Sequence, residues 1–522
     1  MRPTPPNAGV FHRISWKGAA SSRRAPPARG SHLRIQLWER TDFMTMRFGS
    51  AVELAAGVRE RRVSALEIAQ TSLGKISQAN GTSSAFAHID VAGALSAARK
   101  ADRNVQSGHG RLPLAGVPFG IADFDDCLGM PTRHGSSLFW AAKPASVEGP
   151  CLRRLRAAGA IPIGKTVVTE FGWHEHGTCV AAKNPWDPRR SPGNGGAAAV
   201  ASGLVPFAIA SDFDGSVRTG AAYCGVVGFT PSRGLLPVSG RLTPGTYGGD
   251  LRGMGVVATT VRDVAQLLEV AAGADPVDRE SLGRSGERYT ERVEQVDLSG
   301  LRVGWAPDLG YSELDLEVRR IAYDATQAVV AAVGAEVVVS EFYVGDLPLV
   351  SFPAGMWLVA MLEARGLVPE RIDELGPGVR ALVADVLERR EVAGLGGLLA
   401  SYAQAQMQRA ALQQRVATLF TQVDVLLTMA TAGVAPEVRP DETRCEVRAV
   451  DPRAASCAGL ANACWLPAAS VPAGMYAGLP IGLHIVAPFG RDDLVLGLAH
   501  ALEQARPWRT RTDVRSTPAK KG

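Results

Sequence analysis

Short apolar runs alternate along this chain with longer stretches in which hydrophobic residues recur at helical spacing. In the first half, the short runs predict strands at 85–89, 114–121, 160–164 and 207–210. Helical spacing predicts helices at 50–77 (two, broken near Arg62), 92–105, 152–158 and 197–203. Ser64, followed three residues later by Glu67, predicts a capping box at the start of the second helix. Strands that alternate with helices predict an α/β fold in which both faces of the sheet are covered.

The second half of the chain continues this alternation with a larger share of helix. Helices are predicted at 262–272, 316–333 and 494–504, and strands at 301–305, 336–340, 423–429, 467–473 and 482–487. Residues 346–422 are mostly helical by pattern, so we interpret 345–445 as a helical insertion. No flexible linker interrupts 48–510, and we expect a single domain there.

Composition narrows the class of protein. Hydrophobic residues make up 46% of the chain, yet no apolar run reaches the roughly 18 residues that a membrane helix needs. The seven cysteines are scattered without a CxxC pair, which argues against a disulfide framework or a structural zinc site. We therefore expect a cytoplasmic protein with no membrane partner, no metal and no cofactor.

The net charge of +5 comes from the N-terminal segment. Residues 1–43 hold eight Lys and Arg and two acids, which leaves the rest of the chain near −1. A near-neutral body gives no electrostatic reason to expect a nucleic-acid partner. The segment 1–43 is rich in Arg, Pro and Ser and lacks hydrophobic periodicity. We interpret it as disordered or as a mis-annotated extension before a start at Met44 or Met46, with a transit peptide as the alternative, and 511–522 as a loose basic tail.

The stretch 210–228 contains the main candidate for a catalytic side chain in this sequence. It presents Ser216 after a tight Gly215 turn, and the small-residue run 195–203 precedes it. A serine hydroxyl is a weak nucleophile until a positioned base takes its proton. The residues around Ala122 and Asn194 are expected to surround this serine.

Five segments resemble the amidase signature family, in order, from about 50 to about 508. Residues 116–132 resemble the strand that carries the catalytic lysine of the family, and 159–171 resemble the segment that follows it. Residues 183–187 resemble the lead into the serine loop, 212–228 the nucleophile segment, and 466–486 the C-terminal signature. The resemblance implies one α/β/α domain around a large, mixed, twisted sheet, with 345–445 on the substrate side. It also implies cleavage of carbon–nitrogen bonds in amides by a Ser–cisSer–Lys triad, in which the second serine relays the proton to the lysine.

Carried over residue by residue, the resemblance leaves this triad incomplete. Ser216 falls on the nucleophile, but the lysine position is Ala122, whose methyl group cannot accept a proton. Asn194 falls in the cis-serine loop, which is shorter than the family's loop and holds no serine. The resemblance also implies an oxyanion hole made by the backbone N–H groups of Phe213, Asp214 and Gly215, with that of Ser216, and a bracing role for Asp212 and Arg218. Asp214 replaces a usual glycine and places a negative charge beside the developing oxyanion.

Other residues could take the role of the base. Lys165 matches a lysine of a different family segment, so we interpret it as structural. His134, His174 or His176 could act on Ser216, or the latter two could ligate a metal. No third ligand is signalled, so we interpret these histidines as structural or solvent-facing. Of the nearby acids, Asp123, Asp126 and Asp212 match the family and are interpreted as backbone braces, whereas Asp125 and Asp214 have no explanation from the sequence.

We therefore interpret the chain as a degenerate member of the family with weak or no Ser–Ser–Lys activity and a retained pocket for a small amide or related ligand. The alternative is an active hydrolase in which a His or Asp substitutes for the base. A third, less favoured alternative is the ammonia-transferring A subunit of a glutamyl-tRNA amidotransferase. The sequence is also compatible with a homodimer, and its preference for Arg over Lys is typical of a GC-rich bacterial genome.

Overall fold

The computed structural model of the protein describes residues 48–108, 112–173, 182–238, 251–283, 286–310, 315–339, 342–344, 351–441, 444–447 and 452–508. The predictions for 1–43 and 511–522 fall outside these residues, as do those for His174 and His176.

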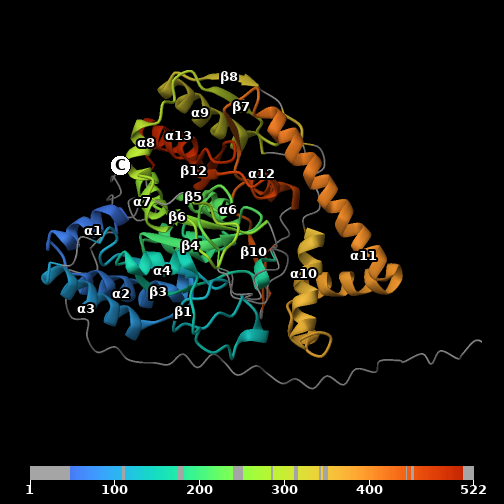
Figure 1. Cartoon of the computed structure of the whole chain (residues 1–522), viewed down its shortest axis with the longest axis horizontal. Coiled ribbons are helices and arrows are strands. Elements are labelled where there is room, and N and C mark those ends of the chain that lie inside the picture. The colour runs from blue at the N-terminus through green and yellow to red at the C-terminus, as the bar shows by residue number, and fades with distance from the viewer. Residues whose placement is uncertain are drawn as a thin grey trace, which may run out of the picture. The chain divides into compact units, whose positions relative to one another are not determined.

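A mixed sheet of 11 strands organises the described part of the chain (Figure 1). In spatial order its strands are β1 (Phe86–Ile89), β3 (Ile161–Thr166), β2 (Pro118–Ala122), β4 (Phe207–Asp212), β6 (Gly253–Ala258), β5 (Val227–Thr230), β12 (Ala468–Tyr476), β13 (Leu479–Val486), β9 (Val425–Met429), β7 (Arg302–Trp305) and β8 (Glu336–Val339). Parallel pairing joins β2 to β3 and β4, and β7 to β8 and β9; the other neighbours are antiparallel. A separate hairpin pairs β10 (Val438–Asp441) with β11 (Arg444–Val447).

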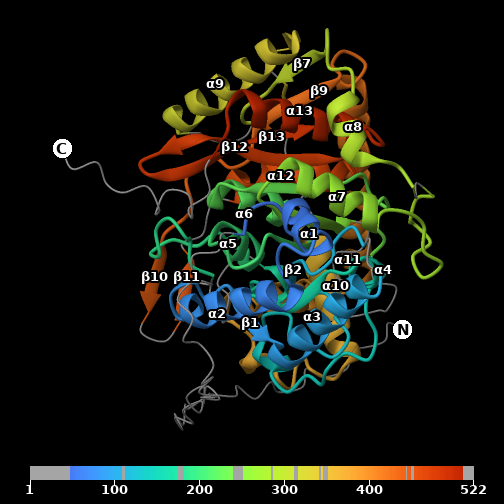
Figure 2. The same ribbon diagram turned by 90° about the vertical axis from the view of Figure 1, so that its left-hand side faces the viewer.

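Helices cover both faces of the sheet, as the alternating pattern predicts (Figures 1 and 2). One face carries α1 (Ala51–Arg59), α4 (Pro150–Ala157), α7 (Val261–Ala271), α8 (Tyr289–Gln295), α9 (Leu316–Val333) and α13 (Asp492–Ala505). The other carries α2 (Ala65–Ser83), α3 (Val91–Gln106), α5 (Gly195–Ala201), α6 (Ser216–Cys224) and α12 (Pro452–Cys464). Short 3₁₀ turns lie at Ser137–Phe139, Glu170–Gly172 and Ile372–Glu374.

The two-residue period of the strands explains this layering. On β2, Phe119 and Ile121 point into the core under α4 and α7, whereas Ala122 points into the core under α5. All five residues of β2 are buried, as in a strand with helices on both sides. The α/β fold with a large mixed sheet is therefore confirmed.

Several local predictions hold and others do not. The predicted helix at 316–333 is α9, and the Ser64–Glu67 capping box forms, because the Ser64 N–H donates to Glu67 Oε2 at 2.9 Å and the Glu67 N–H to Ser64 Oγ at 3.1 Å. The strand predicted from 114 begins only at Pro118, because the chain turns at Gly116 (φ 74°). Strands β5 and β6 were not among the predicted elements.

The region 345–445 is helical over only part of its length. It holds α10 (Ser351–Ala364) and the long helix α11 (Pro377–Leu419), which bends at Gly394. The same region then supplies β9, which lies between β13 and β7 in the central sheet. Strand β9 therefore belongs to the central sheet, and the predicted helical character of 345–445 does not extend to it. In the part of the chain that the structure describes, no helix is both long enough and apolar enough to cross a membrane.

The topology brings three chain segments to one edge of the sheet. Strands β2 and β4 are parallel neighbours with Ile121 opposite Ile209, so the residues that follow both strands lie side by side. Strand β6 runs antiparallel to β4 with Asp212 opposite Gly253, so Arg252 enters at the same edge. Carboxyl ends of neighbouring parallel strands are where open α/β sheets place ligand sites.

Candidate functional site

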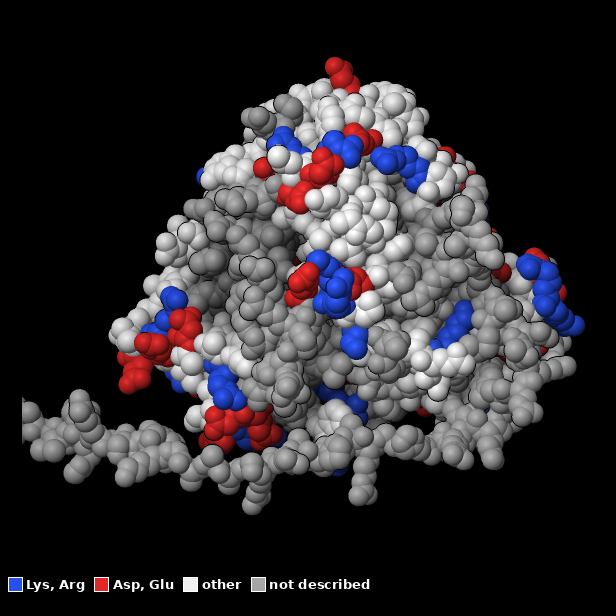
Figure 3. Space-filling view, turned by 180° about the vertical axis from the view of Figure 1, so that it is seen from behind, with Lys and Arg blue, Asp and Glu red and all other residues white. Residues whose placement is uncertain are grey.

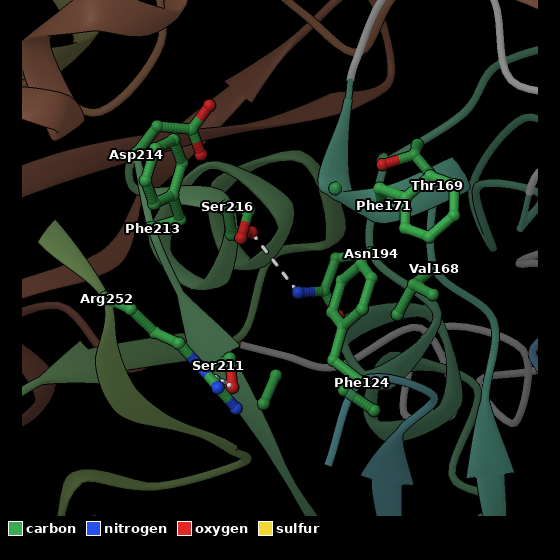
Figure 4. A pocket seen from close by; sticks show the side chains of 14 residues that line it. Phe124, Val168, Thr169, Phe171, Asn194, Ser211, Phe213, Asp214, Ser216 and Arg252 are labelled. Carbon is green, nitrogen blue, oxygen red and sulfur yellow. Dashed lines mark hydrogen bonds between the residues drawn. The ribbon is translucent and has the colours of Figure 1, made fainter. Parts of the chain in front are cut away.

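A cavity of about 50 Å³ lies at this edge of the sheet (Figure 4). Its lining residues are Ala122, Phe124, Val168, Thr169, Phe171, Gly172, Gly193, Asn194, Ala210, Ser211, Phe213, Asp214, Ser216 and Arg252. The structure thus brings together Ser216, Ala122 and Asn194, three positions that were grouped from the sequence. In Figure 4, Ser216 and Asn194 lie between Phe213 and Asp214 on one side and Phe124 and Phe171 on the other.

Ser216 is the first residue of α6 and follows a turn that only glycine fits. Gly215 has φ 101°, and a Cβ there would lie 2.4 Å from Ala458 Cβ. This turn directs the strand β4 into the helix and leaves Ser216 partly exposed at the cavity. Within the described residues, the Ser216 hydroxyl has no hydrogen-bond partner.

Asn194 is the N-cap of α5. Its Oδ1 accepts the Ala197 N–H at 3.0 Å, and its Nδ2 donates to the Ser216 backbone carbonyl at 3.3 Å, the dashed line in Figure 4. Among the residues that the structure describes, the cis peptide bond is Val368–Pro369, so the loop before α5 contains none. The amide of Asn194 therefore positions two helix starts and carries no hydroxyl.

The backbone N–H groups beside Ser216 are not equivalent. The Gly215 N–H donates to Asp212 Oδ1 at 2.7 Å and is therefore engaged in the turn. The N–H groups of Phe213 and Ser216 donate to no other described residue. Of the N–H groups expected to stabilise an oxyanion, that of Gly215 is already committed to a carboxylate.

Asp212 and Arg218 form a fully buried ion pair behind the cavity. Nε and Nη2 of Arg218 each donate to Asp212 Oδ2 at 3.1 Å. The same guanidinium donates to the Ala458 carbonyl at 2.8 Å and to Asn462 Oδ1, and lies 3.0 Å from His484 Nε2. Burial, together with Arg218, holds the pKa of His484 well below its usual value. The pair thus joins the Ser216 turn to α12 and β13.

Arg252 is a cavity residue that was not predicted from the sequence. It is 5% exposed, and its Nη2 donates to Asp125 Oδ1 at 2.7 Å while its Nε donates to Ser211 Oγ at 2.8 Å. Ser211 in turn donates its hydroxyl (2.7 Å) and its N–H (3.1 Å) to Asp125. Asp125, which the sequence left unexplained, is thus the counter-ion of Arg252. The apolar run 253–258 directly follows Arg252 and could have been recognised from the sequence as a strand. That strand would have placed Arg252 at this edge of the sheet.

Lys165 lies behind the cavity and is fully buried. Its Nζ donates to the Asp125 backbone carbonyl and to Thr132 Oγ1 (3.0 Å), and lies 3.7 Å from Asp123 Oδ1. Burial lowers the pKa of Lys165, and Asp123 and Asp125 oppose that shift. Burial likewise raises the pKa of Asp123, against the nearby lysine. Lys165 is not among the lining residues, and its contacts hold the segment after β2 in place.

His134 lies behind two aromatic lining residues. Its ring is stacked against Phe124 and Phe171 with centroids 6.3 and 6.2 Å away, and meets Phe139 edge-on. Burial lowers the pKa of His134 to about 3, and its Nδ1 is buried with no hydrogen-bond partner among the described residues. His134 does not line the cavity. Within the described residues, no group of His, Cys, Asp and Glu side chains could hold a metal ion.

Comparison of the sequence with known proteins assigns the chain to a family. The profile of the Amidase family matches residues 67–496. The chain belongs to the amidase signature family. The A subunit of a glutamyl-tRNA(Gln) amidotransferase from Cyanothece sp. is 32% identical, with 88% of this chain and 98% of the relative covered. An acylamidase from Rhodococcus erythropolis is 31% identical, with 88% of this chain and 96% of the relative covered.

Solved structures of the amidase signature family share the fold. The structure of a bacterial aryl acylamidase of this family superposes with a TM-score of 0.80 over 90% of this chain and 99% of that chain. Its sequence identity is 24%, so the likeness concerns the fold. The α/β fold with a large mixed sheet is thus shared with this family.

The Asp212–Arg218 pair gives a stability prediction. Replacing Arg218 with Met removes the cation and leaves the Asp212 carboxylate buried without its partner. Breaking a buried pair in this way costs about 3–5 kcal/mol of unfolding free energy. Urea denaturation of Arg218→Met should show this loss. Arg320→Met, which breaks an exposed pairing with Glu317 and Asp324, is the control and should change stability little. Equal effects of the two substitutions would contradict the prediction.

His134 gives a pH prediction. In the unfolded chain its pKa returns to the ordinary value of 6.5, whereas burial lowers the folded value to about 3. The unfolded state therefore binds the extra proton between these values, so stability falls as pH falls through that window. Through His134 alone, the unfolding free energy should be about 2–3 kcal/mol lower at pH 4.5 than at pH 7.

The measurement compares unfolding free energies at pH 7 and 4.5. His134→Asn, which suits the left-handed backbone (φ 54°), should flatten the pH dependence by that amount. An unchanged slope in His134→Asn would refute the assignment.

Proposed function

We propose that this protein is a degenerate member of the amidase signature family that binds a small amide or related molecule at the Ser216 cavity. In this proposal it has little or no hydrolytic activity by the Ser–Ser–Lys route. The observation that carries the proposal is which residues occupy the two positions beside Ser216 where the family's base and second serine are expected. Ala122 offers a methyl group and Asn194 a capping amide, and neither can take a proton from the serine.

The cation that lines the cavity supports binding over catalysis. Arg252 lies in the same cavity as Ala122, but a guanidinium stays protonated in proteins and offers no general base. Its partner Asp125 already accepts hydrogen bonds from Arg252 and from Ser211. Asp214 also lines the cavity, where its charge opposes an oxyanion beside Ser216.

The cavity suits a small, partly planar ligand. Phe124 and Phe171 supply apolar faces, and Ser211, Ser216 and Asn194 supply polar groups, which is the usual composition of a small-molecule site. We expect no cofactor and no nucleic-acid partner. On the face in Figure 3, many of the described Lys and Arg side chains lie beside Asp and Glu, and the described ones form no extended basic surface. A cytoplasmic location is part of the proposal.

Active-site labelling tests the proposal directly. The purified full-length chain is treated with a serine-directed fluorophosphonate, and peptide mass spectrometry follows Ser216. Without a base, the hydroxyl should react no faster than an ordinary surface serine. Hydrolysis of a panel of aryl and aliphatic amides should be several orders of magnitude below that of a complete family member.

Two serine variants make this experiment decisive. Ser216→Ala removes the candidate nucleophile, and Ser211→Ala is the matched control in the same cavity. Labelling that disappears in Ser216→Ala but persists in Ser211→Ala would refute the degenerate assignment and favour a hydrolase with a substitute base. Binding of the amide panel is followed separately by thermal shift, so that loss of binding is distinguished from loss of chemistry.

A gain-of-function variant tests the role of the second position. Ala122→Lys restores the lysine but leaves Asn194, so no hydroxyl relays the proton between base and nucleophile. Amide turnover should therefore stay at the background of the unsubstituted protein. Ala122→Lys combined with Asn194→Ser is the comparison. Measurable turnover in Ala122→Lys alone would show that the second serine is dispensable.

A further inference from the structure

Helix α11 is held at its two ends and exposed in its middle (Figure 1). Its first half packs Val379, Val383 and Val386 against the apolar cluster that includes α10. Its last turns pack Leu412, Val416 and Leu419 into another cluster near α12. Between these anchors the helix bends at Gly394, which has φ 67° and ψ 178°. We call residues 392–408, which contain this bend, the elbow.

The elbow carries apolar side chains in solvent. Val392 is 82% exposed, Leu395 67%, Leu399 57% and Met407 73%. Leu395, Leu399, Ala403 and Met407 follow each other at intervals of four residues and form one ridge along the helix. A ridge of this kind that no described element of the chain covers is typical of an interaction surface.

The elbow also lacks charge. Its seventeen residues contain no Asp, Glu, Lys, Arg or His, although 20% of the whole chain is charged. The residues just before it, 385–391, hold five charged side chains, including the exposed pairs Arg389–Asp385 and Arg390–Glu363. An uncharged centre beside a charged rim is the anatomy of a protein–protein interface.

Small residues lie beside the ridge, and we call the surface over Gly396 and Ala400 the groove. Gly396 and Ala400 are exposed next to Leu395 and Leu399, and a Cβ added at Gly396 would meet no atom within 4 Å. Helices pack when the ridge of one enters the groove of the other. The elbow carries both ridge and groove on one surface, so it is complementary to itself, as a two-fold interface requires.

These features favour one occupant over others. An amphipathic helix that binds a bilayer carries Lys and Arg on its polar face, and the elbow has none. A partner with a charged surface would find no counter-charge here. A second elbow would bury no unpaired charge. We propose that two copies of this chain associate through their elbows, with the ridge of each α11 in the groove of the other.

Sedimentation velocity of the full-length chain tests the proposal. The unsubstituted protein should be a dimer at micromolar concentration. Leu395→Glu combined with Leu399→Glu places like charges in the contact and should raise the dissociation constant at least roughly 100-fold. Leu316→Glu, at a site on α9 that is 77% exposed, is the matched control and should remain dimeric. Circular dichroism and thermal unfolding check that all variants are folded.

A second variant separates specific packing from general stickiness. Gly396→Leu fills the groove while adding apolar surface, and the open space around Gly396 lets the monomer accept it. Ridge-into-groove packing predicts weaker association, whereas non-specific association predicts stronger. A monomeric unsubstituted protein, or a dimer that both elbow variants leave intact, would overturn the proposal. Flotation of a monomer with phosphatidylcholine vesicles would assign the elbow to a bilayer instead.

Discussion

The buried ion pair between Asp212 and Arg218 is the interaction on which the candidate site depends. Asp212 ends β4 and holds the Gly215 N–H, while Arg218 lies one turn into α6 and reaches the Ala458 carbonyl. Two fully buried charges are expensive to desolvate, and only complete pairing and hydrogen bonding offset that cost. Here the two charges are hydrogen-bonded to each other and to partners from the Gly215 turn, β5, α12 and β13. The strand, the turn and the helix start therefore have one arrangement, and Ser216 is placed by it.

The cavity beside this framework carries a buried positive charge. It comes from Arg252, directly before β6, and is balanced by Asp125 after β2. A lysine amine can exchange protons at a lowered pKa, whereas a guanidinium can only donate. Under the function proposed above, Arg252 supplies positive charge to the cavity but no base. A shared fold does not by itself imply a shared reaction.

The sequence allowed much of the fold to be predicted because periodicity is a local property. The long helix at 316–333 and the helix at 92–105, observed as α3, follow directly from hydrophobic spacing. The short strands β5 and β6 were missed, since four to six apolar residues beside glycines have no period of their own. That omission hid Arg252, whose place depends on the antiparallel register of β6 with β4. The engagement of the Gly215 N–H by Asp212 is likewise a matter of three-dimensional geometry, as is the role of Asn194 as a helix cap.

Phe171 is part of both the Ser216 cavity and the apolar cluster beside α11. It lines the Ser216 cavity, and it also packs in the apolar cluster with Val379 and Val383 of α11. Next to it, Glu170 accepts the Gly376 N–H at the start of α11 at 2.7 Å and the Ser136 hydroxyl at 2.6 Å. A ligand that displaces Phe171 must therefore also disturb the contacts that hold the start of α11. By the reciprocity of linked equilibria, a ligand that displaces Phe171 and a partner that fixes α11 would each change the binding free energy of the other. Phe171 is thus the residue through which the wall of the cavity contacts the packing of α11.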